Sequence, residues 1–310
     1  MKIVFLGTPH FAKIVLEKLI KSHHKVVAVV CSLDKPQGRG NKLTMPETKQ
    51  FAQEKGIPVF QFAKIRLDGI ETLKNIEADI FVTASFGQIL SQEILDIPPY
   101  GVVNVHGSLL PKYRGASPVQ TALLNGEKVT GVTIIKTFIG IDDGDMLAKK
   151  EVEILDEDNS ETLMEKLAYV GGDLLVETLD NIENGTATFT PQDIAQATYT
   201  KMLKKENAFL NFSLPAKNLH NFVRAYYLNP CAHFVFDNNV FKVLKSNVYS
   251  ELAPKGNEGE VVISSSKEGL VIACGEGFLE IISLQAPAGK VMSAKSYLNG
   301  KSLPVGTILN

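Results

Sequence analysis

Residues 2–19, KIVFLGTPHFAKIVLEKL, decide what kind of fold this chain can form. The apolar run at residues 3–6 predicts a buried strand, and Thr8 and Pro9 then supply a candidate N-cap and a first helical residue. Apolar side chains follow at the spacing of one helix face: Phe11, Val15 and Leu19. The stretch therefore predicts a strand, a tight turn and a helix in direct succession.

The same alternation continues along the first part of the chain. Short apolar runs predict further strands at 26–30, 80–83, 102–106, 132–137 and 146–152. Helical patterns lie at 46–55, 88–95, 118–124 and 161–184. We expect Gly171 and Gly172 to interrupt the last of these helices. Strands that alternate with helices predict an α/β fold, with a Rossmann-like, mostly parallel sheet and helices on both faces.

The last third of the chain has a different pattern. Residues from about 186 to 206 show little periodicity and are interpreted as a linker. A helix is expected at 214–227, followed by short β-like runs at 233–236, 240–248, 260–264, 270–274 and 278–284, with hairpin turns at 237–239 and 275–277. We therefore predict a first domain at 1–188, a linker at 189–206 and a small OB-like β-barrel domain at 207–310.

The composition is that of an ordinary globular protein. The 310 residues are 45% hydrophobic with a formal net charge of -2, which neither indicates nor excludes a local nucleic-acid-binding patch. The three cysteines are far apart and lack CxxC spacing, so neither a disulfide framework nor structural zinc is expected. No apolar run is long enough for a signal peptide or a membrane span. A cytoplasmic protein without a targeting segment is expected.

Candidate catalytic groups stand in residues 104–115, NVHGSLLPKYRG, where a predicted strand ends. Asn104 and His106 are two residues apart and therefore share one face of that strand. In open α/β sheets, ligands bind beyond the carboxyl ends of the strands. An Asn amide there can donate to a developing oxyanion, and a His can donate or transfer a proton. Both side chains could instead satisfy neighbouring backbone groups.

A carboxylate can complete this pair. Residues 140–145, GIDDGD, lie between two predicted strands, with glycines that permit a tight path around Asp142 and Asp143. Asp142 could set the protonation state of His106 or accept a proton through water, or could be an ordinary turn residue. The spacing does not favour a hard-cation site. Residues 7–12 lack the GxGxxG pattern, so a nicotinamide cofactor is poorly supported.

Taken together, these motifs resemble a known enzyme family. Asn104 and His106, the SLLPKYRGASP that follows them, and Asp142 after GVTII resemble the formyltransferases that use 10-formyltetrahydrofolate. Three further stretches are similar to the branch of that family that formylates methionyl-tRNA: DKPQGRGNKL at 34–43, ASPVQTALLNGE at 116–127 and LQAPAGKVMSAKSYLNG at 284–300. The resemblance runs nearly from end to end.

The resemblance implies an activity and roles for the three polar residues. A formyl group would pass from 10-formyltetrahydrofolate to the amino group of methionine on initiator methionyl-tRNA, in support of translation initiation. Asn104 would donate to the tetrahedral oxyanion, and His106 would be a second donor or a proton carrier. Asp142 would hold His106 in the right state and help to take the proton of the attacking amine. Neither a metal nor a covalent enzyme intermediate is expected.

The resemblance also implies two binding surfaces on a monomeric protein. The folate site would be formed, largely through backbone groups, by Phe86, Gly87, Gln88, Ile89, Leu90, Ser108, Leu109, Leu110, Pro111, Ile139, Gly140 and Ile141. The tRNA would be held by a basic loop at 34–42 and by the C-terminal domain, through Lys35, Arg39, Lys42, Lys290, Lys295 and Lys301.

Three other functions stay open at this point. A formyltransferase that acts on a nucleotide sugar would need neither the basic loop nor this C-terminal domain. A folate- or tRNA-binding module without catalysis would have no use for a proton-transfer group beside an oxyanion donor. A nicotinamide dehydrogenase is disfavoured by the missing glycines.

Overall fold

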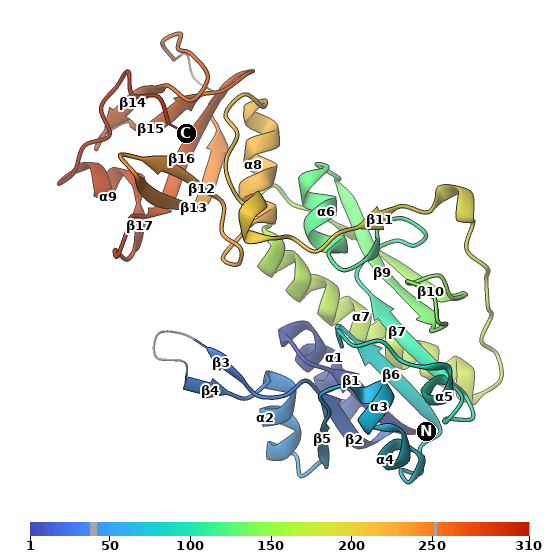
Figure 1. Cartoon of the computed structure of the whole chain (residues 1–310). Helices are drawn as coiled ribbons and strands as arrows, with labels where there is room; N and C mark the ends of the chain where they lie inside the picture. Colours follow the sequence, from blue (N-terminus) through green and yellow to red (C-terminus); the bar gives the residue numbers. More distant parts are fainter. Residues whose placement is uncertain (38–41, 251–252, 310) are drawn as a thin grey trace. The chain divides into compact units, whose positions relative to one another are not determined.

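The computed structural model describes residues 1–37, 42–250 and 253–309 (Figure 1). The chain folds as two compact units. Unit 1 comprises Met1–Pro118, Val129–Ile154 and Leu163–Thr200, and unit 2 comprises Val119–Lys128, Leu155–Thr162 and Lys201–Asn310. The domain boundaries at 188 and 206 stay a prediction.

Unit 1 is built on a seven-stranded sheet in the order β10-β9-β7-β6-β1-β2-β5. Its strands are β1 (Lys2–Gly7), β2 (Lys25–Cys31), β5 (Val59–Gln61), β6 (Ile80–Ala84), β7 (Val102–His106), β9 (Val129–Lys136) and β10 (Met146–Glu153). Five neighbouring strands are parallel: β7, β6, β1, β2 and β5. Strands β9 and β10 add an antiparallel edge. This arrangement confirms the predicted Rossmann-like, mostly parallel sheet.

Helices cover both faces of this sheet (Figure 1). One face packs against α1 (His10–Lys21) and α7 (Ser160–Glu183). The other face is covered by short helices whose side chains join an apolar cluster with Val4, Leu6 and Phe81: α3 (Ile65–Asp68), α4 (Ile70–Lys74) and α5 (Gln92–Leu95). Because both faces are covered, the central strands read as continuous apolar runs. The remaining helices of this half of the chain are α2 (Glu47–Glu54) and α6 (Pro118–Leu124).

The expected interruption of α7 at Gly171 and Gly172 is wrong, since the helix runs through both residues. A Cβ on Gly171 would lie 2.8 Å from Val105 Cγ1 of β7, and one on Gly172 would lie 2.6 Å from Lys18 Cγ of α1. The two glycines therefore let α7 approach the sheet and α1 closely.

Two further local expectations are wrong. The helix predicted at 88–95 begins only at Gln92, and the side chain of Gln88 instead bonds the backbone of Phe62 and Ile65. Thr8 does not cap α1, because its hydroxyl accepts a hydrogen bond from the Ser32 amide at 3.1 Å.

The predicted basic loop is held by an antiparallel pair of short strands, β3 (Lys35–Gln37) and β4 (Lys42–Thr44). Other short elements of unit 1 also went unpredicted: β5, α3 and α4, together with β8 (Arg114–Gly115), η1 (Ile194–Gln196) and β11 (Tyr199–Thr200). β11 pairs in parallel with β8, so residues 199–200 are part of unit 1 rather than free chain.

The small β-barrel predicted for the C-terminal domain is, in unit 2, an antiparallel sheet curled into a half-barrel, in the order β12-β13-β16-β15-β14, with β17 paired to β16. Besides α6, which belongs to this unit from Val119 onward, its elements are η2 (Lys205–Asn207), α8 (Ala216–Ala225), β12 (His233–Phe236), β13 (Asn239–Val248), β14 (Val261–Ser265), β15 (Gly269–Ala273), β16 (Phe278–Gln285), β17 (Val291–Ser293) and α9 (Ala294–Leu298). Asp237 and Asn238 both have positive φ, of 49° and 57°, which confirms the first hairpin turn. Among the described residues, no helix is long and apolar enough to cross a bilayer.

The glycine contact on β7 yields a stability prediction. Gly171→Val should lower the free energy of unfolding by about 1–3 kcal/mol, because the new side chain overpacks the contact with Val105. Denaturant unfolding measures the change. Glu177→Val, on an exposed position of the same helix, is the matched control and should stay within about 0.5 kcal/mol of the parent. Equal stability of the two variants would contradict the close packing of α7.

Candidate active site

The candidate site begins where the apolar face of the sheet becomes polar. Phe81 of β6 and Val102 of β7 belong to the apolar cluster under α3–α5. Two residues further along each strand, on the same face, come Thr83 and Asn104, which are register partners. His106 follows Asn104 on that face and is 6% exposed. The strands thus place three polar side chains together, toward their carboxyl ends.

Thr83 fixes the orientation of the Asn104 amide. The Thr83 hydroxyl donates to Asn104 Oδ1 at 2.8 Å. The amide nitrogen, Nδ2, therefore points the other way, and it lies 3.5 Å from Asp142 Oδ1. An amide held in this way presents N–H donors to the space beside Asp142. Sequence reasoning missed Thr83, whose only signal is a polar residue near the end of an apolar strand.

His106 is held by a backbone carbonyl. Its Nε2 lies 2.9 Å from the carbonyl oxygen of Tyr113. Because a carbonyl oxygen only accepts, Nε2 carries a proton. The other ring nitrogen, Nδ1, faces Asp142 Oδ2 at 3.6 Å. Neutral His106 therefore has its basic nitrogen on the side of the carboxylate, and protonated His106 has a donor there.

The loop between β9 and β10 brings Asp142 to these two residues. Asp142 has φ +48°, a conformation that Asp adopts more readily than most residues, and its Oδ2 accepts the Gly115 amide at 2.8 Å. The tight backbone path predicted for the glycines of this loop is confirmed at Gly144, where a Cβ would collide with the carbonyl of Lys136. The three candidate catalytic residues predicted from the sequence thus lie together.

A buried glutamine, also missed by sequence reasoning, holds this loop. Gln192 Nε2 donates to the carbonyl oxygens of Asp142, at 2.8 Å, and Gly144, at 2.7 Å. Its Oε1 accepts two hydrogen bonds from the guanidinium of buried Arg114, at 3.1 and 2.8 Å. Arg114 also lies over the ring of Tyr199 in β11. The segment predicted to be a linker therefore contributes to the site through Gln192 and Tyr199.

The predicted folate residues differ in accessibility. Ile89, Ile139 and Ile141 are 69, 64 and 63% exposed, so their apolar side chains are open to a ligand. Neighbouring Phe138, which was not predicted, is 48% exposed. Gly87 has φ +76° and, like Gly140, is exposed.

The other predicted folate residues have side chains engaged within the protein. Phe86 and Leu90 belong to the apolar cluster under α3–α5, and Leu110 packs with Ile135 and Met146. The Ser108 hydroxyl donates to the Lys112 carbonyl at 2.7 Å. Leu109 packs on β9 beside Gly131, Pro111 accepts the Thr198 amide through its carbonyl, and Gln88 bonds Phe62 and Ile65. Contact with a ligand at these positions would involve mainly the backbone.

The described residues among those predicted to bind tRNA are divided between the two units. Lys35 is exposed in β3, Lys42 begins β4, and Arg39 lies outside the described residues. Lys290, Lys295 and Lys301 are all exposed in unit 2.

The network around Gln192 yields a second prediction. Gln192→Leu should lower the free energy of unfolding by about 1–3 kcal/mol, since it leaves the Arg114 guanidinium and two loop carbonyls without their partner. Denaturant unfolding tests this, and hydrogen exchange of residues 138–145 should accelerate. Gln196→Leu, on the exposed η1, is the matched control and should change little. Unchanged exchange in the first variant would mean that Gln192 does not hold the loop.

The whole chain matches known proteins. The formyl transferase family matches residues 1–179, and the formyl transferase C-terminal domain matches residues 202–302. The methionyl-tRNA formyltransferase of Acetivibrio thermocellus is 44% identical over 100% of this chain and 99% of its own length. That of Thermodesulfovibrio yellowstonii is 41% identical over 98% of this chain and 97% of its own length.

A solved structure has the same fold. It is the crystal structure of an N-formyltransferase from Helicobacter canadensis in complex with folinic acid and dTDP-3-aminofucose. The superposition has a TM-score of 0.67 at 21% sequence identity and covers 91% of this chain and 98% of that chain. At this identity the likeness concerns the fold.

Proposed function

The chain belongs to the formyl transferase family, and from this membership we propose that it transfers the formyl group of 10-formyltetrahydrofolate to the amino group of methionine on initiator methionyl-tRNA. Relatives at 44 and 41% identity over nearly their full length carry the name of that enzyme. The observation that carries the mechanism is the convergence of an amide donor, an imidazole and a carboxylate at Asn104, His106 and Asp142.

The reaction makes one C–N bond and breaks another. The methionine amino nitrogen attacks the formyl carbon, and the oxygen of the formyl group becomes an oxyanion. Asn104 Nδ2 donates to that oxyanion, and the hydrogen bond from Thr83 keeps the amide turned for the task. Because this donor is positioned before the reaction starts, little reorganisation is needed in the transition state.

Two proton transfers complete the reaction. The attacking amine loses a proton, and N10 of the folate gains one as its bond to the formyl carbon breaks. His106 Nδ1 and the Asp142 carboxylate, 3.6 Å apart, are the groups that accept and return the proton. The Tyr113 carbonyl holds the His106 ring through Nε2, and the Gly115 amide holds Asp142 through Oδ2. The formyl group arrives already activated on the folate, so the enzyme supplies positioning, an oxyanion donor and proton transfer.

The exposed apolar residues near this site suit the folate. Ile89, Ile139 and Ile141 expose apolar side chains to solvent. A flat ring system can cover this apolar surface and remove it from water. The Helicobacter canadensis relative of the same fold was crystallised with folinic acid, a folate derivative. We assign the pterin to this surface and the backbone of residues 86–90 and 108–111.

The basic surfaces suit the tRNA. Lys49 donates to Asp34 at 2.8 Å, and this hydrogen bond, with one from Gln61, lowers the pKa of Asp34. Asp34 is the acidic residue of the predicted basic loop at 34–42. Its charge is thus already paired with Lys49. Lys290, Lys295 and Lys301 supply exposed charge on unit 2 for phosphate contacts.

The oxyanion role yields a kinetic prediction. Asn104→Ala should lower kcat by about 100- to 1000-fold with little change in KM, because the donor acts in the transition state. The assay measures formylation of methionyl-tRNA by 10-formyltetrahydrofolate. Asn75→Ala, at the exposed end of α4, is the matched control and should keep parental kcat. Near-parental kcat in the first variant would remove Asn104 from the chemistry.

The phosphate contacts yield a binding prediction. A plot of log Kd for tRNA against log salt between 50 and 200 mM should be steep, and Lys290→Ala should reduce its slope by about 1. Lys255→Ala removes the same charge from an exposed site that follows the last residue of β13, whereas Lys290 follows Gln285, which pairs near the start of β13. This control should keep the parental slope. Equal slopes for all three proteins would exclude Lys290 from the tRNA surface.

A further inference from the structure

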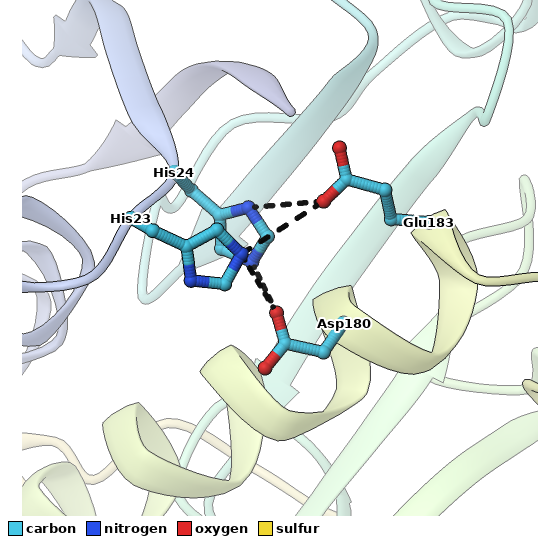
Figure 2. A group of neighbouring side chains, drawn as sticks. All are labelled: His23, His24, Asp180 and Glu183. Carbon is cyan, nitrogen blue, oxygen red and sulfur yellow. Dashed lines mark ion pairs between the residues drawn. The ribbon is translucent and has the colours of Figure 1, made fainter.

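Four potential metal ligands meet far from the candidate active site. His23 and His24 stand between α1 and β2, and Asp180 and Glu183 lie three residues apart on the last turns of α7. Residues at that spacing share one face of a helix. Figure 2 shows the two imidazoles and the two carboxylates pointing toward one another.

The ligand atoms are close enough to share one ion. Asp180 Oδ1 lies 3.1 Å from the Nε2 atoms of both His23 and His24. Glu183 Oε2 lies 3.9 Å from His23 Nε2. One donor atom from each of the four residues can be chosen so that all lie within 4.8 Å of one another. Donors of a tetrahedral zinc ion, at bond lengths near 2.1 Å, are about 3.4 Å apart, so small side-chain rotations suffice.

Two atoms of the cluster are buried without a hydrogen-bond partner. The His24 side chain is 0% exposed, and its Nε2 makes no hydrogen bond in the described structure. The same holds for Asp180 Oδ1, the atom that it faces. Native proteins seldom leave such atoms unsatisfied, and a bound ion is one of the usual reasons when they do. A cation between them would satisfy both.

We propose that His23, His24, Asp180 and Glu183 form a binding site for a divalent first-row transition metal of the zinc type. Two imidazoles with carboxylates are a donor set that suits zinc, whereas calcium and magnesium prefer oxygen alone. His23 is largely exposed, which provides an entry path.

The N-terminus supports the ligands from behind. The Met1 amino group donates to Glu183 Oε1 at 3.1 Å, and it lies 3.1 Å from His24 Nδ1. Metal ligands in proteins are typically oriented by such contacts on their far side. The ring and the carboxylate are therefore held in place before an ion arrives.

The site lies at the amino ends of β1 and β2, whereas Asn104 and His106 lie toward the carboxyl end of β7. An ion here would link the α1–β2 turn to the end of α7. Its role would be to stabilise unit 1, and it is independent of formyl transfer.

The test is a zinc titration of the metal-stripped full chain by isothermal calorimetry, with cobalt as a spectroscopic probe. We expect one equivalent of Zn²⁺ to bind, Co²⁺ to give visible ligand-field bands, and zinc to raise the Tm. His23→Ala and Asp180→Asn should weaken zinc binding by about 100-fold or more, since loss of even an indirect contact costs about 10- to 100-fold. His23 is exposed, so its removal should leave the fold intact.

Glu177→Gln, one turn earlier on α7 and exposed, is the matched control and should bind zinc like the parent. Absence of stoichiometric binding, or equal zinc affinity in the parent and in His23→Ala, would overturn the proposal. Formylation of methionyl-tRNA should be unchanged in His23→Ala. Failure of the metal site and failure of the proposed activity are therefore separate results.

Discussion

The side-chain amide of Gln192 holds the candidate active site together. Its two N–H groups donate to the carbonyls of Asp142 and Gly144, and its oxygen accepts both bonds from Arg114. The amide therefore donates two hydrogen bonds and accepts two, which satisfies this buried polar group. Asp142 lies in a loop, where a carboxylate would otherwise be mobile. The geometry of the proposed proton transfer thus depends on a residue that takes no part in the chemistry.

The sheet supplies the rest of the geometry by a change of polarity along one face. Phe81 and Val102 bury that face in an apolar cluster, and Thr83 and Asn104 follow two residues later. Rigid strands position such side chains more accurately than loops do. On the opposite face, Gly171 lets α7 pack directly on Val105, which fixes β7 from behind. Packing on one face and hydrogen bonding on the other therefore hold the same strand.

Sequence patterns predicted the parts of the structure that depend on local information. Apolar runs located four of the five parallel strands, all but β5, and the spacing of Asn104 and His106 placed them on one face. The helix interruption expected at Gly171 and Gly172 is wrong because the helix penalty of glycine is local, whereas its advantage here comes from contacts with other elements. Gln192 could not be found, since it is one polar residue in an aperiodic segment and its partner Arg114 lies 78 positions away. The short β3, β4 and β5 strands, three residues each, are too brief to show a period.

The two ends of this sheet differ in how their buried polar groups are satisfied. Toward the carboxyl end, Thr83, Asn104, His106 and Gln192 have protein partners, so the site is organised before substrates bind. At the amino end, His24 Nε2 and Asp180 Oδ1 face each other without a hydrogen bond. Buried polar atoms need hydrogen-bonding or charged partners. At the carboxyl end the chain itself supplies these partners, whereas at the amino end it does not satisfy both atoms. An external ligand at the second position is therefore the simplest way for the protein to obey one rule at both ends.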